Sequence, residues 1–125
     1  MAVRAHQIIW HVLTLTLASC AAAPTARIMS IKECERSEVC TVRGLLEMSN
    51  DGHAYIGKIH IDGGGCVNVS LPEAESRRRS GQPMQMITVT GKVFPYVYEN
   101  TLIEYRINNR KIGYGLCGDY FVFAK

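Results

Sequence analysis

Four cysteines, Cys34, Cys40, Cys66 and Cys117, restrict the folds open to this chain of 125 residues more than any other feature. Their spacings lack the short paired repeats of zinc sites. An even number of cysteines in an exported chain predicts two disulfides, and three pairings are possible. We favour Cys34 with Cys40, which are close in a polar segment, and hence Cys66 with Cys117 as a long-range link. Reduced, buried thiols are the alternative.

Export itself is indicated by the first 19 residues. Residues 1–7 carry Arg4 and no acid, and residues 8–18 form an apolar run. These are the n-region and h-region of a secretory signal peptide. As a helix the run would reach about 16 Å, half of a membrane's hydrocarbon core, so a permanent span is disfavoured.

The residues that follow the run are Leu17, Ala18, Ser19 and Cys20. This segment resembles the lipobox of bacterial lipoproteins, which reads Leu, two small residues and Cys. The resemblance implies cleavage before Cys20 and acylation of that cysteine, and Ala21 behind it resembles the pattern for outer-membrane delivery. Several acyl chains anchor a protein stably. Cleavage after the run of alanines at 21–23, which would release a soluble periplasmic protein, is the alternative.

The division that follows is a signal peptide at 1–19, a lipidated tether at 20–27 and one domain at 28–125, near the usual domain size. Period-2 alternation predicts strands at 41–48, 53–62, 66–71 and 86–94, with a hairpin turn at 49–52 and a glycine turn at 63–65. Residues 72–79 predict a short helix, with Pro first, acids early and bases late. Residues 102–107 and 120–124 predict further strands, with a turn at Asn108 and Asn109.

Three strands, a helix and two or three more strands resemble the element order of the OB-fold. We therefore expect a mainly β protein, a small five- to six-stranded OB-like Greek-key barrel with one short helix. A small β-sandwich or another kind of barrel is the alternative.

Catalytic and metal-binding patterns are missing from the sequence: it has no nucleophile elbow, zinc-protease helix or phosphate loop. His53 and His60 are expected on opposite faces of one strand, so they would not share a metal. His60 and Asp62 share a face, where a solvated surface is the better interpretation. We expect no enzyme activity, no metal and no cofactor, and the net charge of +3 is too small to indicate nucleic acid.

One segment mixes aromatic rings with positive charge, and its candidate ligand-binding residues are Lys92, Tyr96, Tyr98, Tyr105 and Arg106, with Arg110 and Lys111 close by. OB-folds bind oligosaccharides and oligonucleotides through such surfaces. Alternatively, the tyrosines cover one end of the barrel. The function expected is a non-enzymatic outer-membrane lipoprotein that faces the periplasm and binds an envelope protein or glycan. A soluble periplasmic ligand-binding protein or inhibitor is second, and a small periplasmic enzyme is third.

Overall fold

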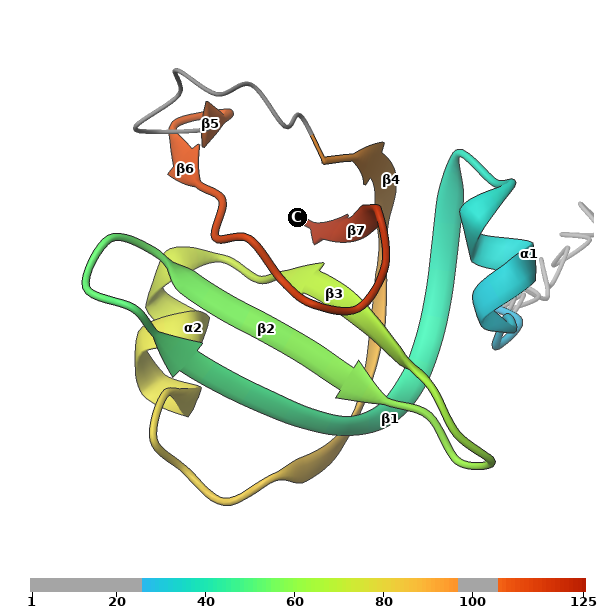
Figure 1. Cartoon of the computed structure of the whole chain (residues 1–125), viewed down its shortest axis with the longest axis horizontal. Coiled ribbons are helices and arrows are strands. Elements are labelled where there is room, and N and C mark those ends of the chain that lie inside the picture. Colours follow the sequence, from blue (N-terminus) through green and yellow to red (C-terminus); the bar gives the residue numbers. More distant parts are fainter. Residues whose placement is uncertain (1–25, 97–105) are drawn as a thin grey trace, which may run out of the picture.

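The computed structural model describes residues 26–96 and 106–125, which form a closed five-stranded β-barrel (Figure 1). The elements, in chain order, are α1 (Ile31–Glu35), β1 (Val39–Asn50), β2 (Tyr55–His60), β3 (Cys66–Ser70), α2 (Glu73–Arg79), β4 (Gln85–Pro95), β5 (Arg106–Ile107), β6 (Arg110–Lys111) and β7 (Tyr120–Ala124). The predicted signal peptide, Cys20, Tyr98 and Tyr105 lie outside the described residues.

The strands follow the order β1-β2-β3-β7-β4 around the barrel, and β4 pairs again with β1. β3 and β7 run parallel, whereas the other pairs are antiparallel. A meander of three strands, a helix that crosses to β4 and a last strand inserted between β3 and β4 make the OB-like Greek-key barrel that the sequence predicts. β5 and β6 form a separate hairpin within the connection from β4 to β7.

The strand boundaries agree with the alternation to within two residues, but the first turn is displaced. β1 continues to Asn50, and the chain reverses at residues 51–54 instead of 49–52. Of the predicted strand at 102–107, only the last two residues are described, as β5. Asn108 and Asn109 both have positive φ, at 48° and 64°, which is the conformation of a tight two-residue hairpin turn.

The fold prediction counted one helix, but the described residues contain two. α2 begins one residue later than expected, with Pro72 at its N-cap. α1 is stabilised at its start by a capping box, in which the Ser30 hydroxyl accepts from the Glu33 amide and the Glu33 carboxylate accepts from the Ser30 amide. A helix of five residues is too short to leave a clear periodicity in the sequence.

The barrel core is built from inward-facing aliphatic side chains, among them Val42, Ile59 and Val122, which are fully buried. Gly44 and Gly91 also face inward, where the strands pass very close to each other. A methyl group on Gly44 would overlap the carbonyl oxygen of His60, and one on Gly91 would overlap that of Phe123. Glycine at these positions lets the strands coil into a barrel this small.

Both predicted disulfides are present. Cys34 pairs with Cys40 and joins α1 to β1, and both residues are fully buried. Cys66 pairs with Cys117 and joins the start of β3 to the segment before β7, across 51 positions of sequence. A second, smaller core on the outer face of β7 contains Tyr96, Ile112, Phe121 and Phe123.

Candidate functional site

The outer face of β2 and β3, where OB barrels bind their ligands, is partly covered by the chain itself. Residues 113–119, which we call the strap, lie over β3 and are tied to it by the Cys66–Cys117 disulfide. Asn68 points outward from β3, yet it is only 1% exposed because the strap covers it. Its amide oxygen accepts from the Cys117 amide at 3.1 Å, and its amide nitrogen donates to the carbonyl oxygen of Tyr120 at 3.1 Å.

The strap fits closely against the sheet. A methyl group on Gly115 would overlap the side-chain oxygen of Asn68, and one on Gly113 would lie 2.6 Å from Cγ1 of Ile56. The hydroxyl of Tyr96 fixes the same segment from the other side, since it donates to the Gly113 carbonyl and accepts from the Gly115 amide, both at 3.1 Å. In this conformation the chain's own backbone occupies the part of the face formed by β3.

The part of that face formed by β2 carries a small charged group. Glu47 of β1 lies between Lys58 and His60, with its carboxylate 3.5 Å from the Lys58 ammonium and 2.8 Å from Nε2 of His60. Hydrogen bonding from His60, followed by the charge of Lys58, lowers the pKa of Glu47. His60 thus pairs with Glu47 of the neighbouring strand and not with Asp62. His53 lies in the β1–β2 loop and not in the same strand as His60.

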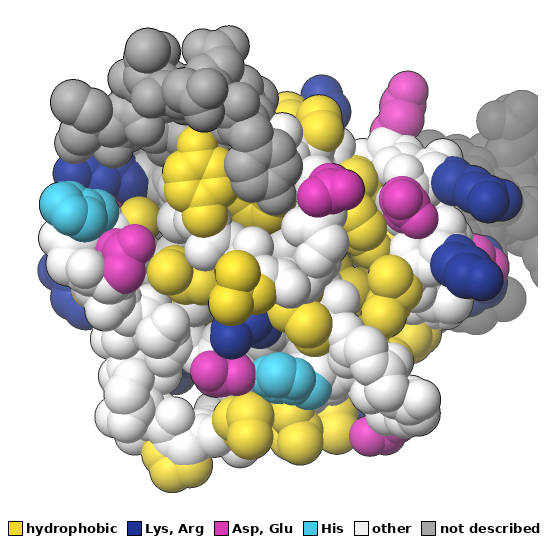
Figure 2. Space-filling view, in the orientation of Figure 1, with side chains coloured by type: hydrophobic (Ala, Val, Ile, Leu, Met, Phe, Trp, Pro, Cys, Tyr) yellow, Lys and Arg dark blue, Asp and Glu magenta, His cyan; other side chains and the backbone are white. Residues whose placement is uncertain are grey.

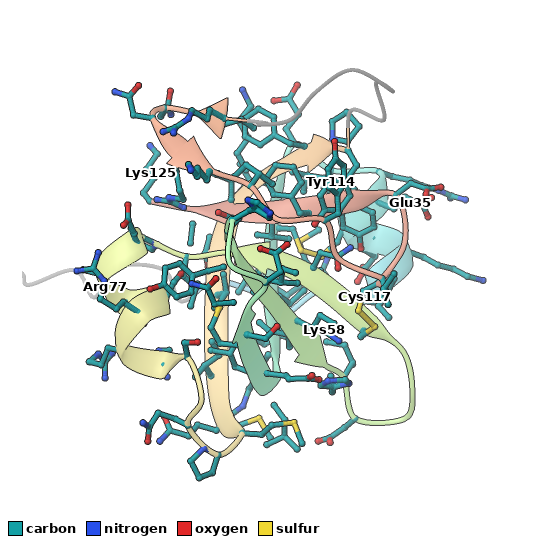
Figure 3. The ribbon with its side chains drawn as sticks, turned by 60° about the vertical axis from the view of Figure 1, so that its left-hand side comes forward. Glu35, Lys58, Arg77, Tyr114, Cys117 and Lys125 are labelled. Atoms are coloured by element: carbon teal, nitrogen blue, oxygen red, sulfur yellow. A yellow bond between two sulfur atoms is a disulfide. The ribbon has the colours of Figure 1, made fainter. Side chains whose placement is uncertain are left out.

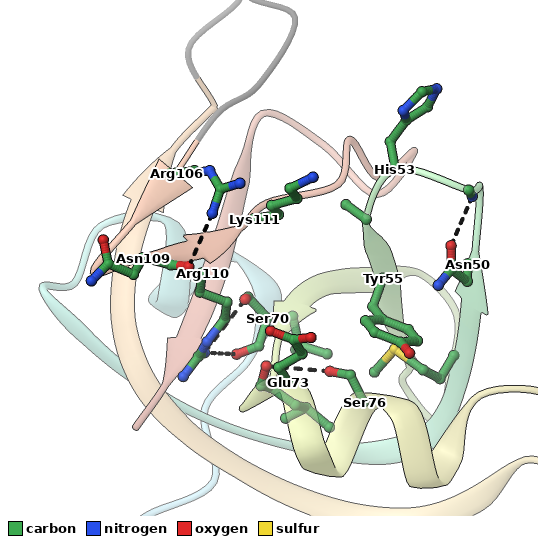
Figure 4. A pocket seen from close by; sticks show the side chains of 15 residues that line it. Asn50, His53, Tyr55, Ser70, Glu73, Ser76, Arg106, Asn109, Arg110 and Lys111 are labelled. Carbon is green, nitrogen blue, oxygen red and sulfur yellow. Dashed lines mark hydrogen bonds between the residues drawn. The ribbon is translucent and has the colours of Figure 1, made fainter.

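A cavity lies at the end of the barrel where the β1–β2 loop, α2 and the β5–β6 hairpin meet (Figure 4). Its volume is about 280 Å³. We call it the cationic pocket, and its lining residues are Met48, Asn50, Gly52, His53, Ala54, Tyr55, Val69, Ser70, Leu71, Glu73, Ser76, Arg106, Asn109, Arg110 and Lys111. Figure 2 shows basic side chains gathered beside a histidine at this end of the molecule.

The β1–β2 loop holds His53 at the pocket through local hydrogen bonds. The Asp51 carboxylate accepts from the backbone amides of His53 at 2.8 Å and Ala54 at 2.9 Å, and the Asn50 side chain accepts from Gly52 at 2.7 Å. The two amides, with that of Ala54 contributing more, lower the pKa of Asp51. The loop is therefore shaped by its own Asn-Asp-Gly sequence, which is typical of tight turns.

The β5–β6 hairpin supplies the cations. Arg106 and Lys111 face each other in its register, and Arg106 donates to the carbonyl oxygen of Asn109 at 3.4 Å. Together with Arg110, the described lining residues include three cations and a single carboxylate, that of Glu73. Glu73 in turn pairs with Arg77 one turn along α2, at 3.0 Å. The lining is therefore positively charged.

Arg110 is held in place by several hydrogen bonds. Its Nη1 donates to the carbonyl oxygen of Ala124 at 2.7 Å, to the carbonyl oxygen of Ser70 at 3.0 Å and to the Ser70 hydroxyl at 3.4 Å. Its guanidinium carbon lies 4.0 Å from the centre of the Phe123 ring. All these partners are uncharged, and no ion pair within the described ranges includes Arg110. Burial lowers the pKa of Arg110, but arginine stays protonated at neutral pH.

The predicted ligand-binding residues are separated by the fold. Arg106 lines the cationic pocket. Lys92 lies exposed on β4, outside the pocket lining, with its ammonium 5.1 Å from the centre of the Phe94 ring. Tyr96 is only 8% exposed, and its ring packs against Phe121 at 5.0 Å between centres, so it is a packing residue and not the predicted stacking surface. Tyr98 and Tyr105 lie outside the described residues.

Sequence patterns identified the basic hairpin but missed the rest of the pocket. Tyr55, Ser70 and Glu73 come from a strand start, a strand end and a helix start, and each fits its element without suggesting a site. The cations on both sides of Asn108 and Asn109 do indicate a basic site, because a two-residue turn at these asparagines brings the cations together.

Scans of protein-family models, curated proteins and solved structures found no match to this chain. Among residues 26–96 and 106–125, no helix has the length and hydrophobicity to cross a membrane. The same residues contain no group of three or more His, Cys, Asp or Glu side chains that could hold a metal ion.

Proposed function

We propose that this chain is a non-enzymatic lipoprotein of the bacterial envelope, whose cationic pocket binds an anionic group of an envelope glycan. The observation that carries the proposal is the guanidinium of Arg110, which is fixed at the pocket wall and whose partners among the described residues are all uncharged. A cation that is removed from water without a counter-charge costs free energy. An anionic ligand in the pocket would recover part of that cost.

The pocket is preorganised for such a ligand. Its hydrogen bonds hold Arg110 in one orientation, so binding would not have to order that side chain, which reduces the entropic cost. Arg106 and Lys111 add positive charge on the exposed hairpin. Arginine recognises carboxylate and phosphate groups through paired hydrogen bonds, so both kinds of anion suit the site.

A glycan suits the remaining lining. Tyr55 presents an aromatic ring, Asn50 presents an amide, and Ser70 presents a hydroxyl in the same small cavity. Apolar surface combined with a few placed polar groups is the usual composition of a small-molecule site. Oligosaccharide binding by OB barrels agrees with this, although a fold alone does not assign a function.

Two observations support the proposed lipid anchor. One is the sequence Leu17, Ala18, Ser19 and Cys20, and the other is the pair of disulfides, which suit an oxidising compartment. Intact mass of the protein purified from a bacterial membrane fraction tests it. We expect an N-terminus at Cys20 with added acyl chains. An unmodified chain that begins after Ala23 would contradict the anchor and favour a soluble periplasmic protein.

Calorimetric titration of the mature domain tests the pocket. N-acetylmuramic acid differs from N-acetylglucosamine by a lactyl group that carries a carboxylate, so the two sugars form a matched pair. We expect binding of the acid only, and its loss in the double variant Arg106→Ala, Lys111→Ala. The control is Lys32→Ala, Arg36→Ala, which removes the same charge from α1, outside the pocket lining. Equal binding of both sugars, or equal loss in both variants, would contradict the proposal.

A further inference from the structure

We infer that the lipid anchor turns the cationic pocket away from the membrane that holds it, so that the pocket receives an acidic glycan of the cell wall and not a headgroup of that membrane. This inference rests on the proposed anchor and pocket. It adds a direction and a ligand class, which come from the place where the tether joins the fold.

The chain is fixed to the barrel from Arg27 onward. Arg27 donates twice to the Glu33 carboxylate, at 3.0 Å each, and the Met29 amide donates to the carbonyl oxygen of Thr41 on β1 at 2.8 Å. Ser30 then begins α1. The end of the molecule that carries α1 is therefore the end to which the anchor is attached.

The tether is short. From Cys20 to Arg27 there are seven residue steps, which span at most about 25 Å even when fully extended. A domain of about 100 residues has a radius of gyration of about 13 Å, and hence a diameter above 30 Å. The tether is therefore shorter than the domain is wide. It cannot reach from the membrane around the barrel to bring the opposite end into contact with the headgroups.

The cationic pocket lies at that opposite end. Its elements, the β1–β2 loop, α2 and the β5–β6 hairpin, are at the left of Figure 1, whereas α1 is at the right. Glu35 of α1 and Arg77 of α2 remain on opposite sides in the rotated view of Figure 3. No residue from 26 to 47 contributes to the pocket lining.

Charge alone would favour the reverse orientation. Around α1 the described cations Arg27, Lys32 and Arg36 are balanced by the acids at 33, 35 and 38, so this end has no net attraction to anionic lipids. The pocket end carries an excess of positive charge, which anionic headgroups attract. Without the tether, an anionic membrane would therefore draw the pocket toward itself. The tether and the charge make opposite predictions, which an experiment can separate.

Energy transfer from a single tryptophan measures the orientation. Trp10 is the only tryptophan of the chain and lies in the predicted signal peptide, so a chain that begins at Cys20 has none. We would prepare Glu35→Trp on α1 and Ala74→Trp on α2, both exposed positions outside the pocket lining. With the disulfides formed, Cys20 has the only free thiol and is coupled to a maleimide lipid in vesicles that contain phosphatidylglycerol and a dansyl-labelled lipid.

We expect severalfold stronger transfer from Glu35→Trp than from Ala74→Trp when Cys20 is coupled to the lipid. With the Cys20 thiol blocked and the protein added to the same vesicles, the order should reverse. Equal transfer from the two tethered variants, or stronger transfer from Ala74→Trp, would overturn the inference. Because the anchor is attached chemically, the result does not depend on acylation in cells, which the mass measurement tests separately.

A second experiment tests the ligand class. Vesicles that carry the tethered protein should co-sediment with purified peptidoglycan, and Arg106→Ala, Lys111→Ala should abolish this while Lys32→Ala, Arg36→Ala should not. Lipid A placed in the same vesicles offers phosphates on the anchoring membrane, and we expect it to leave co-sedimentation unchanged. Inhibition by lipid A would show that the pocket reaches its own membrane and would overturn the inference. Failure of the free domain to bind N-acetylmuramic acid would instead contradict the proposed function.

Discussion

Removal of the Cys66–Cys117 disulfide should destabilise the domain more than removal of the Cys34–Cys40 disulfide. Each disulfide is removed as a pair of alanines, Cys66→Ala with Cys117→Ala and Cys34→Ala with Cys40→Ala, so that no free thiol remains. The separations are 51 and 6 residues, for which the loop-entropy model gives about 4 and about 2.2 kcal/mol of stabilisation at 25 °C. The expected difference is therefore about 2 kcal/mol.

Packing acts in the opposite direction. Cys34 and Cys40 are both fully buried, whereas Cys66 is half-buried and Cys117 is 7% exposed, so the short disulfide loses more packing when it is removed. Urea denaturation separates the two effects, because loss of a long cross-link expands the unfolded chain and increases the dependence of the unfolding free energy on urea. We expect the larger increase in the Cys66, Cys117 variant. An equal slope in both variants, together with a greater loss of stability in the Cys34, Cys40 variant, would refute the reasoning.

Three other positions give independent tests. Gly91→Ala should lower the free energy of unfolding, measured in urea, by about 2 kcal/mol or more, because the added methyl group overlaps the Phe123 carbonyl. Gly52→Ala is the control: Gly52 lies in open space at a φ of 92°, so this change should cost about 1 kcal/mol through backbone strain alone. Equal losses in the two variants would contradict the close strand contact. Asn68→Ala leaves the buried hydrogen-bonding groups of the strap unpaired, so it should lower the free energy of unfolding by about 2 to 4 kcal/mol and speed hydrogen exchange of the Cys117 backbone amide. Unchanged exchange would show that the Asn68 side chain does not hold the strap. The pKa of Glu47 is lowered in the folded state. Its contribution to stability is therefore present at a pH above the ordinary pKa of a glutamate, and it is lost as the pH falls through the folded-state pKa. Glu47→Gln should therefore flatten the acid side of a plot of urea midpoint against pH, and an unchanged acid slope would contradict the assignment.

Much of the fold could be predicted because the strands alternate strictly. Val42, Leu46 and Met48 of β1 face the core while Arg43 faces solvent, which is the pattern that the sequence shows. Of the three possible disulfide pairings, the structure has the one that the closeness of Cys34 and Cys40 in sequence favours. The burial of Thr41 and Asn68 did not follow from the alternation, since both point outward and both are buried, Thr41 at 4% and Asn68 at 1% exposure. A period-2 pattern describes one sheet and cannot show which segment will cover its outer face.

The candidate site could be predicted only in part, for a related reason. Arg106, Arg110 and Lys111 form a basic group next to a turn in the sequence, but the sequence shows only that Tyr96 is near them along the chain and not whether it shares their surface. The structure packs Tyr96 under the strap, where its hydroxyl bonds to Gly113 and Gly115. The pocket also depends on Ser70 and Glu73, which reach it through the crossing from β3 to α2. Such a meeting of distant segments depends on tertiary structure.

Amide chemical-shift mapping of the ¹⁵N-labelled mature domain, titrated with N-acetylmuramic acid, tests whether the cationic pocket binds an acidic sugar. We expect saturable shifts concentrated at the pocket, in residues 50–55, 70–76 and 106–111, with the side-chain signals of Arg110 among the largest changes. N-acetylglucosamine should leave these signals in place. Shifts concentrated on the outer face of β2, around Lys58 and His60, or no shifts at all, would contradict the cationic pocket as the binding site.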